Sequence, residues 1–146
     1  IQGAAFVDRY RTQHGRQKQV SAAEVAEAHQ QRIAQIDPSI GSYLTVTPQV
    51  SRQQASTADA RIANGTAGPL TGVPMQLKDN LSTRGVPTTC ASNMLSGYKP
   101  PYDATVTASL TSAGAVLLGK GNMDEFAMGS TTENSAFGPT RTPWLV

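Results

Sequence analysis

A short alternating segment followed by a second apolar run constrains the fold more than any other feature of this sequence. Val73, Met75 and Leu77 alternate with Gln76 and Lys78. A period of two places the three apolar side chains on one face and the two polar ones on the other, as in a half-buried β-strand. The pattern therefore predicts a strand that ends in the sequence Lys-Asp-Asn, with Lys78 at its edge.

The second apolar run, residues 115–118, is typical of a buried strand, and the pattern between the two runs is helical. We expect Asp103 to cap this helix at its start and Gly114 to end it. The apolar residues at helical spacing should form its buried face: Val106, Leu110 and Ala113. A strand, a crossover helix and a second strand predict a parallel βαβ unit, and so an α/β fold.

The residues before this unit predict two more helices and a strand. Ser21 and Glu24 form a capping-box pair ahead of a helix over 22–36, which we expect Asp37-Pro38 to end. Residues 42–47 have strand character. Thr47 and Pro48 suit the start of a second helix that runs to Ala63.

Long irregular segments cover residues 81–101 and 122–143, and they are rich in small and hydroxyl-bearing residues. The chain holds 12 Ser, 16 Thr and 13 Gly, whereas charged residues make up 15%, below the roughly 25% of ordinary globular domains. Long loops in compact domains are usually functional. We therefore expect the functional groups of this chain in these two segments.

Charge and hydropathy make several classes of protein improbable. The net charge is +2, and four of the basic residues are near the N-terminus: Arg9, Arg11, Arg16 and Lys18. Aromatic residues make up 5%, too few for a nucleic-acid surface built on stacking. No run is apolar enough to span a membrane, and no segment resembles a secretory signal. The single cysteine agrees with a reducing compartment.

Three motifs that suggest chemistry have better structural explanations. The spacing from Gly114 to Lys120 matches a phosphate-binding loop, but Gly121 stands where the magnesium-binding hydroxyl belongs, and the intervening residues are themselves strand-like. His14 and His29 do not converge with other ligands into a metal site, so we expect no metal. Cys90 has no histidine partner and is expected to be a buried thiol.

Two other features favour a reactive site. The first is Lys78, at the end of its predicted strand. A lysine that loses solvation there has a lowered pKa and is able to act as a base, although a lysine at a strand end more often extends to water. The segment 128–132 joins small residues and hydroxyls, so its backbone N–H groups are able to approach an anion or oxyanion closely. The same composition fits an ordinary surface loop equally well.

Taken together, these stretches resemble the amidase signature family. The resemblance rests on the segments 68–80 (Gly-Pro-Leu-Thr-Gly-Val-Pro-Met-Gln-Leu-Lys-Asp-Asn), 87–92, 100–106 and 119–144. It covers about residues 21–144 and is dense from Gly68 onward. Within the family, the chain is most similar to the branch of A subunits of glutamyl-tRNA(Gln) amidotransferases.

The resemblance implies a Ser-cis-Ser-Lys amidase. Lys78 matches the family's neutral lysine base, which acts through a serine held by a cis peptide on the nucleophilic serine. Met128, Gly129 and Ser130 match the part of the motif that lines the amide pocket. The implied fold is the N-terminal portion of the amidase signature fold, a mixed β-sheet core flanked by helices and incomplete in this chain.

One departure from the family concerns the two serines. The family's Gly-Gly-Ser-Ser-Gly-Gly-Ser stretch follows the Pro-Trp segment, but here Pro143-Trp144 is followed only by Leu145 and Val146. We therefore expect residues 1–146 to be an inactive N-terminal fragment of a single amidase domain. Residues 1–66 would form a helical N-terminal region and residues 67–146 the start of the catalytic core.

The family branch also implies the reaction and its partners. Glutamine would be hydrolysed, and the ammonia would pass to a B subunit that uses ATP and magnesium to convert Glu-tRNA(Gln) to Gln-tRNA(Gln), with a C subunit clasping the pair. This chain would hold no cofactor and would contact no membrane, and it would meet tRNA only through the complex. Its compartment would be a bacterial cytoplasm or an organelle matrix. The alternatives are a stand-alone amidase with another amide substrate and a non-catalytic interaction module from a truncated gene.

Overall fold

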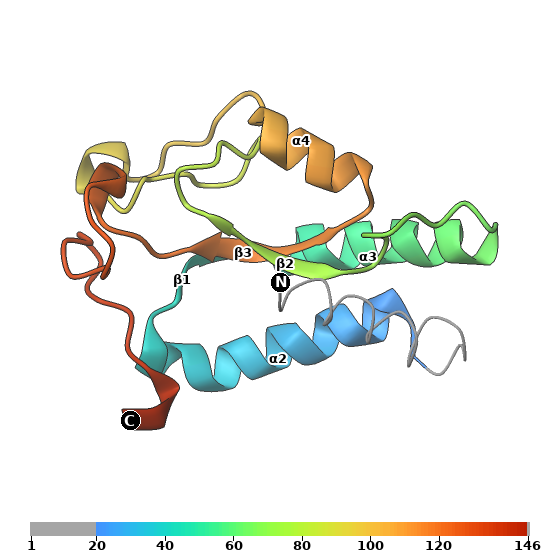
Figure 1. Cartoon of the computed structure of the whole chain (residues 1–146), viewed down its shortest axis with the longest axis horizontal. Helices are drawn as coiled ribbons and strands as arrows, with labels where there is room; N and C mark the ends of the chain where they lie inside the picture. The colour runs from blue at the N-terminus through green and yellow to red at the C-terminus, as the bar shows by residue number, and fades with distance from the viewer. Residues whose placement is uncertain (1–19, 146) are drawn as a thin grey trace.

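A computed structural model describes residues 20–145 of the chain. The N-terminal basic residues and His14 lie outside the described residues. Over the described part, three α-helices surround a three-stranded mixed sheet, which confirms the α/β class. Figure 1 shows helix α4 on one side of the sheet and helix α2 on the other.

Helix α2 (Ala22–Ile40) begins as its sequence predicts and ends later. The Ser21 hydroxyl accepts from the Glu24 amide, and the Glu24 carboxylate accepts from the Ser21 amide, which completes the capping box. The expected end at Asp37-Pro38 is wrong. A proline removes one backbone N–H from a helix, but Pro38 lies inside α2 and does not end it. The left-handed Gly41 (φ 70°) ends the helix instead, and its N–H donates to the Asp37 carbonyl.

Helix α3 (Pro48–Ala63) has the predicted bounds, with proline in its first turn. The Thr47 side chain does not cap it but donates to the Leu117 carbonyl, because Thr47 is buried against the sheet. Helices α2 and α3 pack through small side chains, which allow the helices to approach closely. The core cluster consists of Ala22, Ala26, Ala55, Ala58 and Val116.

The sheet has the order β1-β3-β2, with β1 at Tyr43–Val46, β2 at Pro74–Lys78 and β3 at Val116–Gly121. Strand β3 is buried along its whole length; it runs parallel to β2 and antiparallel to β1. The predicted βαβ unit is thereby confirmed. The register slips by one residue at Leu118, since Met75 pairs with Leu117 and Gln76 with Gly119.

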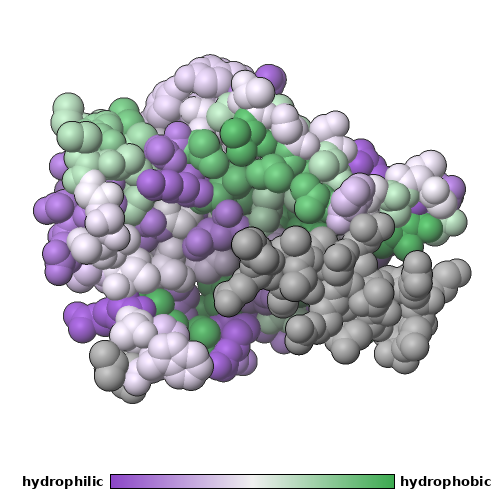
Figure 2. Space-filling model, in the orientation of Figure 1, coloured by the Kyte–Doolittle hydropathy of each residue, from purple (hydrophilic) through white to green (hydrophobic). Residues whose placement is uncertain are grey.

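Helix α4 (Thr105–Ser112) crosses between the parallel strands but buries a different face from the one predicted. Its buried residue is Thr107, whose hydroxyl donates to the Ser82 carbonyl, while Val106 is 50% exposed. The long loop after β2 therefore packs on the hydroxyl-bearing face. Figure 2 shows apolar residues reaching the surface in the upper half of the face drawn, the half that holds α4 in Figure 1.

Asp103 does not cap helix α4, so that prediction is also wrong. Its carboxylate accepts from the Arg84 amide at 2.7 Å and ties two parts of the loop together. The remaining short elements are single 3-10 turns: η2 (Asn93–Leu95), η3 (Glu125–Ala127) and η4 (Pro143–Leu145). Within residues 20–145, no helix is both long and apolar enough to cross a membrane.

Gly114, which follows helix α4, provides a test of this packing. Its φ is 88°, and a Cβ there would lie 2.9 Å from the Thr71 Oγ1 and 3.1 Å from the Thr71 Cα. We expect Gly114→Ala to lower the free energy of unfolding by about 1–3 kcal/mol more than Gly97→Ala. Gly97 also has a positive φ (77°) but has open space around it, so this control isolates the steric clash in a comparison of urea denaturation curves. Equal losses would contradict the packing described here.

Candidate active site

Lys78 is the last residue of strand β2 and pairs with Gly121 of β3. Leu77 before it and Asp79 after it are buried, whereas the Lys78 side chain is exposed. Strand alternation therefore puts Lys78 on the opposite face from its two neighbours. The expected position at the end of an apolar strand is confirmed, but the expected desolvation is absent, because no element among residues 20–145 covers this face at Lys78.

The strand beside Lys78 carries no side chain at the paired position. A Cβ on Gly121 would lie 2.7 Å from the Gln76 Cδ, so glycine is needed for the Gln76 side chain to lie across the sheet. The Gln76 amide donates to the Ser42 carbonyl at 3.0 Å, which fixes it there. Gln76 and Lys78 are both exposed on this face of the sheet, so a reacting group is able to approach Lys78.

Beneath this surface lies a buried ion pair that the sequence analysis did not identify. Lys120 and Asp79 are both fully buried, with Lys120 Nζ 3.5 Å from Asp79 Oδ1. The Lys120 ammonium also donates to the Leu81 carbonyl at 2.8 Å and to Thr88 Oγ1 at 2.9 Å. Asp79 Oδ2 accepts from the amide and the hydroxyl of Thr89, at 2.8 and 2.6 Å.

Burial lowers the pKa of Lys120, and the negative charge of Asp79 acts against that shift. Lys120 thus has the desolvated setting that the sequence analysis expected for Lys78. Its position inside β3 also confirms that the Gly114–Lys120 spacing is not a phosphate-binding loop, because the ammonium is buried among protein groups. The available signal was a lysine between two glycines that directly continues an apolar strand.

A strained turn at Cys90 and Ala91 links the end of β2 to the second long loop. Both residues have positive φ (52° and 53°), as do Phe126 and Ala127 (50° and 64°), a conformation that costs non-glycine residues about 1–3 kcal/mol each. The Cys90 amide donates to the Asp79 carbonyl, and the Cys90 carbonyl accepts from the Phe126 amide. One backbone hydrogen bond therefore joins the two left-handed turns, and another joins the first turn to the residue after Lys78.

Cys90 is half-buried rather than fully buried as expected. Burial raises the pKa of its thiol, the charge of Asp79 raises it further, and Lys120 opposes both. The thiol therefore stays protonated at neutral pH, which does not favour a nucleophilic role.

Met128, Gly129 and Ser130 form the exposed tip of a loop that wraps around the carboxylate of Asp124. Asp124 Oδ2 accepts from the Thr131 and Thr132 amides, both at 2.9 Å, and Oδ1 accepts from the Asn134 amide at 3.0 Å. A Cβ on Gly129 would lie 2.6 Å from the Asp124 Cγ. The loop does place amides around an anion, but this anion is the protein's own carboxylate.

Asp124 and Glu125 lie at the start of the single turn η3, whose Phe126 has a non-helical backbone. Asp124 binds the loop, while Glu125 accepts from the Ser92 hydroxyl at 2.5 Å. Over residues 20–145, no cluster of three or more His, Cys, Asp or Glu side chains is arranged to hold a metal ion.

The Asp124 carboxylate makes the loop sensitive to acid. The amides of Thr132 and Asn134, with a contribution from Thr131, hold the pKa of Asp124 below its ordinary value. Its stabilising effect is present above the unfolded-state pKa of about 4 and is lost as the pH falls through the lower folded-state pKa. We therefore expect the Thr131, Thr132 and Asn134 amides to exchange with solvent faster below pH of about 4, once the intrinsic pH dependence of exchange is subtracted. An Asp124→Asn variant should show fast exchange at neutral pH too, and unchanged protection in that variant would contradict this role.

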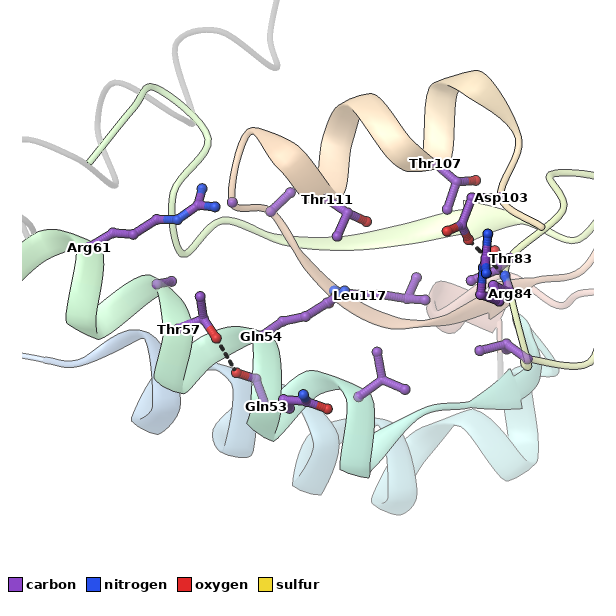
Figure 3. A pocket seen from close by; sticks show the side chains of 15 residues that line it. Gln53, Gln54, Thr57, Arg61, Thr83, Arg84, Asp103, Thr107, Thr111 and Leu117 are labelled. Atoms are coloured by element: carbon purple, nitrogen blue, oxygen red, sulfur yellow. Dashed lines mark hydrogen bonds between the residues drawn. The ribbon is translucent and has the colours of Figure 1, made fainter. Parts of the chain in front are cut away.

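A cavity of about 550 Å³ lies elsewhere, between helices α3 and α4 (Figure 3). Arg61 projects into it from α3 and Thr111 from α4, and Thr83, Arg84 and Asp103 gather at its other end. Neither Lys78 nor the loop tip 128–130 lines it. The cavity is therefore separate from the residues that the sequence singles out.

The structure thus connects the predicted residues in part. The Lys78 end of β2 and the loop that carries Met128, Gly129 and Ser130 are joined through Cys90, with Asp79 and Lys120 beneath them. This surface presents the exposed Lys78 side chain and a loop that three amide hydrogen bonds tie to the Asp124 carboxylate.

Comparisons with known proteins show that most of this chain is similar to one family of enzymes. The family model described as Amidase matches residues 24–145. The A subunit of glutamyl-tRNA(Gln) amidotransferase from Acidothermus cellulolyticus is 57% identical over 128 residues, which is 87% of this chain and 25% of that protein. The corresponding protein of Geobacter metallireducens is 52% identical, over 88% of this chain and 27% of that protein. This chain spans about a quarter of the length of both relatives.

Solved structures of amidases have the same fold over this length. The crystal structure of the glutamyl-tRNA(Gln) amidotransferase A subunit from Thermotoga maritima superposes with a TM-score of 0.69 at 38% identity, over 84% of this chain and 25% of that chain. Native peptide amidase from Stenotrophomonas maltophilia superposes with a TM-score of 0.79 at 32% identity, over 93% of this chain and 29% of that chain. These residues therefore have the architecture of one part of a larger α/β enzyme.

Proposed function

Because the chain belongs to the amidase family, we propose that it is the lysine-bearing N-terminal part of a glutamine amidohydrolase subunit that supplies ammonia for converting Glu-tRNA(Gln) to Gln-tRNA(Gln). The observation that carries the proposal is the similarity at 52–57% identity to amidotransferase A subunits, together with the exposed Lys78 at the end of β2. In the structural superpositions the identity is 38% to the amidotransferase A subunit and 32% to the peptide amidase, a small difference in favour of the amidotransferase.

In the proposed mechanism, Lys78 is the base of a Ser-cis-Ser-Lys triad. The neutral amine takes a proton from a bridging serine, which takes one from the nucleophilic serine as that serine attacks the glutamine side-chain amide. As the C–N bond of the adduct breaks, the leaving nitrogen takes that proton back from Lys78 through the bridging serine, so that ammonia departs and a glutamyl ester remains on the nucleophilic serine. Water then hydrolyses the ester to glutamate and restores the serine. The two serines would come from residues beyond this sequence, and those residues would cover the open face at Lys78. That cover would supply the desolvation of Lys78 that residues 20–145 do not provide.

Met128, Gly129 and Ser130 are proposed to line the amide pocket. The Asp124 carboxylate holds the loop behind them through three amide hydrogen bonds, so the tip is presented on a fixed base. Residues 1–66 and 67–146 are proposed as the helical region and the start of the catalytic core of one domain.

The proposed partners follow the same family branch. A B subunit would use ATP and magnesium to activate Glu-tRNA(Gln) and accept the ammonia, and a C subunit would complete the complex, in a bacterial cytoplasm or an organelle matrix. This chain would hold no cofactor and contact tRNA only through the complex. Residues 1–146 alone are expected to be inactive.

The experiment that tests the substrate measures ammonia release by the full-length protein that contains these residues. Glutamine and a panel of unrelated amides are compared, with and without the B and C subunits. We expect glutamine to be hydrolysed in preference, with the rate rising when the partner subunits are present. Hydrolysis of unrelated amides without that of glutamine would favour the stand-alone amidase instead.

A further inference from the structure

The buried Asp79–Lys120 ion pair is a costly way to stabilise the sheet. Both side chains are fully buried, and taking two charges out of water is so costly that apolar residues of similar size often replace such pairs without loss. Among residues 20–145, Asp79 Oδ1 has no hydrogen-bond partner, and the Lys120 ammonium lies 3.5 Å from it as its ion-pair partner. An interaction this costly is better explained by the position that it fixes.

That position is the end of strand β2. The Asp79 amide donates to the Gly121 carbonyl at 3.0 Å, its carbonyl accepts from Cys90, and its carboxylate accepts twice from Thr89. The residue directly after Lys78 is thus held by its backbone and its side chain alike. Since the Asp79 side chain is buried and that of Lys78 is exposed, fixing Asp79 sets the direction in which the Cα–Cβ bond of Lys78 leaves the strand.

Lys120 extends this fixation to the loop that follows. It binds Leu81 and Thr88 on either side of the turn, while its own backbone pairs with Leu77. One buried ammonium therefore connects strand β3, the residues after β2 and the start of the strained Cys90 turn. Cys90 in turn accepts from Phe126, which precedes the loop tip 128–130.

From these contacts we propose that the buried Asp79–Lys120 pair positions the Lys78 amine relative to the loop tip 128–130, with Asp79 and Lys120 acting as positioning residues. The proposal rests on the proposed function, in which Lys78 is the base. The pair does not touch the substrate. It sets the distance and direction over which the proton moves, and a misplacement of about 1 Å at such a site lowers the rate about 100-fold.

The test compares turnover with stability in the full-length protein. Asp79→Asn combined with Lys120→Met removes both charges and keeps the bulk of both side chains. If the pair only stabilised the fold, the double variant would have both the unfolding midpoint and the kcat of wild type. We expect an unfolding midpoint close to that of wild type, a kcat for glutamine about 100-fold lower than that of wild type, and a KM within about twofold of it. A double variant with wild-type kcat would overturn the proposal.

Milder variants keep the test decisive if the double variant does not fold. Thr89→Val removes the hydroxyl bond to Asp79, and Thr88→Val removes the bond from Lys120. Each should lower kcat about fivefold at unchanged KM. The matched control is Thr57→Val, whose hydroxyl bonds the Gln53 carbonyl on the exposed face of α3 and should leave kcat unchanged. Wild-type kcat in both Thr88→Val and Thr89→Val would also overturn the proposal.

Lys78→Ala separates this proposal from the one it rests on. If Lys78→Ala is inactive and the double variant is fully active, the positioning role is wrong and the proposed function stands. If Lys78→Ala keeps wild-type turnover, the proposed function is wrong, and the positioning role falls with it.

Discussion

Replacing Lys78 by alanine in the full-length protein is expected to lower kcat for glutamine hydrolysis about 10⁴-fold, the loss typical of removing one member of a nucleophile-activating triad. The fold should remain intact, because the Lys78 side chain is exposed at a strand end and surface substitutions change stability by about 0.5 kcal/mol or less. Steady-state ammonia release gives the rate, and circular dichroism with urea denaturation gives the stability.

Two further variants sharpen this result. Lys78→Arg should be as inactive as Lys78→Ala, because a guanidinium stays protonated and is unable to accept the serine proton. Lys99→Ala removes another exposed lysine, from the loop that follows β2, and should keep wild-type turnover. An active Lys78→Arg enzyme would show that position 78 supplies positive charge rather than a base.

Lys120→Met is expected to have the largest effect on stability of any substitution considered. The methionine keeps most of the side-chain bulk but leaves the fully buried Asp79 carboxylate without its counter-charge. Breaking a buried pair from one side costs about 3–5 kcal/mol, which we expect as the loss in free energy of unfolding measured by urea denaturation at neutral pH.

The control for this prediction is Lys99→Met, the same chemical change at an exposed lysine, which should cost about 0.5 kcal/mol or less. Adding Asp79→Asn to Lys120→Met should recover most of the loss, because no uncompensated charge then remains. A Lys120→Met variant as stable as Lys99→Met would contradict the buried pair.

Local patterns predicted most of the elements of the fold. The capping box placed the start of α2, Pro48 placed that of α3, and the strand–helix–strand pattern gave the parallel pair β2 and β3. These signals lie within a few residues of the elements that they define. Two of the errors arose where distant residues decide the outcome: Thr107 is buried because the loop at Ser82 packs on it, and Asp103 binds Arg84 rather than the helix.

The position of Lys78 could be predicted from the sequence, but the arrangement around it could not. The alternating pattern placed Lys78 at a strand end, where it lies. The loop amides expected to approach an anion or oxyanion bind the Asp124 carboxylate of the protein itself. It did not reveal Asp79 and Lys120 as a pair, because they are 41 positions apart and meet only through the register of β2 and β3. The same register leaves Lys78 on the open face of the sheet. This exposure depends on how the strands pair and could not be predicted from the residues next to Lys78.

The most direct test of the proposed role follows Gln-tRNA(Gln) formation in a complex reconstituted from the full-length protein and its B and C subunits, with ATP, magnesium and Glu-tRNA(Gln). Glutamine and ammonium chloride are compared as nitrogen donors for wild type and Lys78→Ala. We predict that wild type uses both donors, whereas the Lys78→Ala complex uses ammonium chloride at the wild-type rate and glutamine about 10⁴-fold more slowly. A Lys78→Ala complex that uses glutamine as well as wild type does would contradict the assignment of Lys78 as the base that releases ammonia.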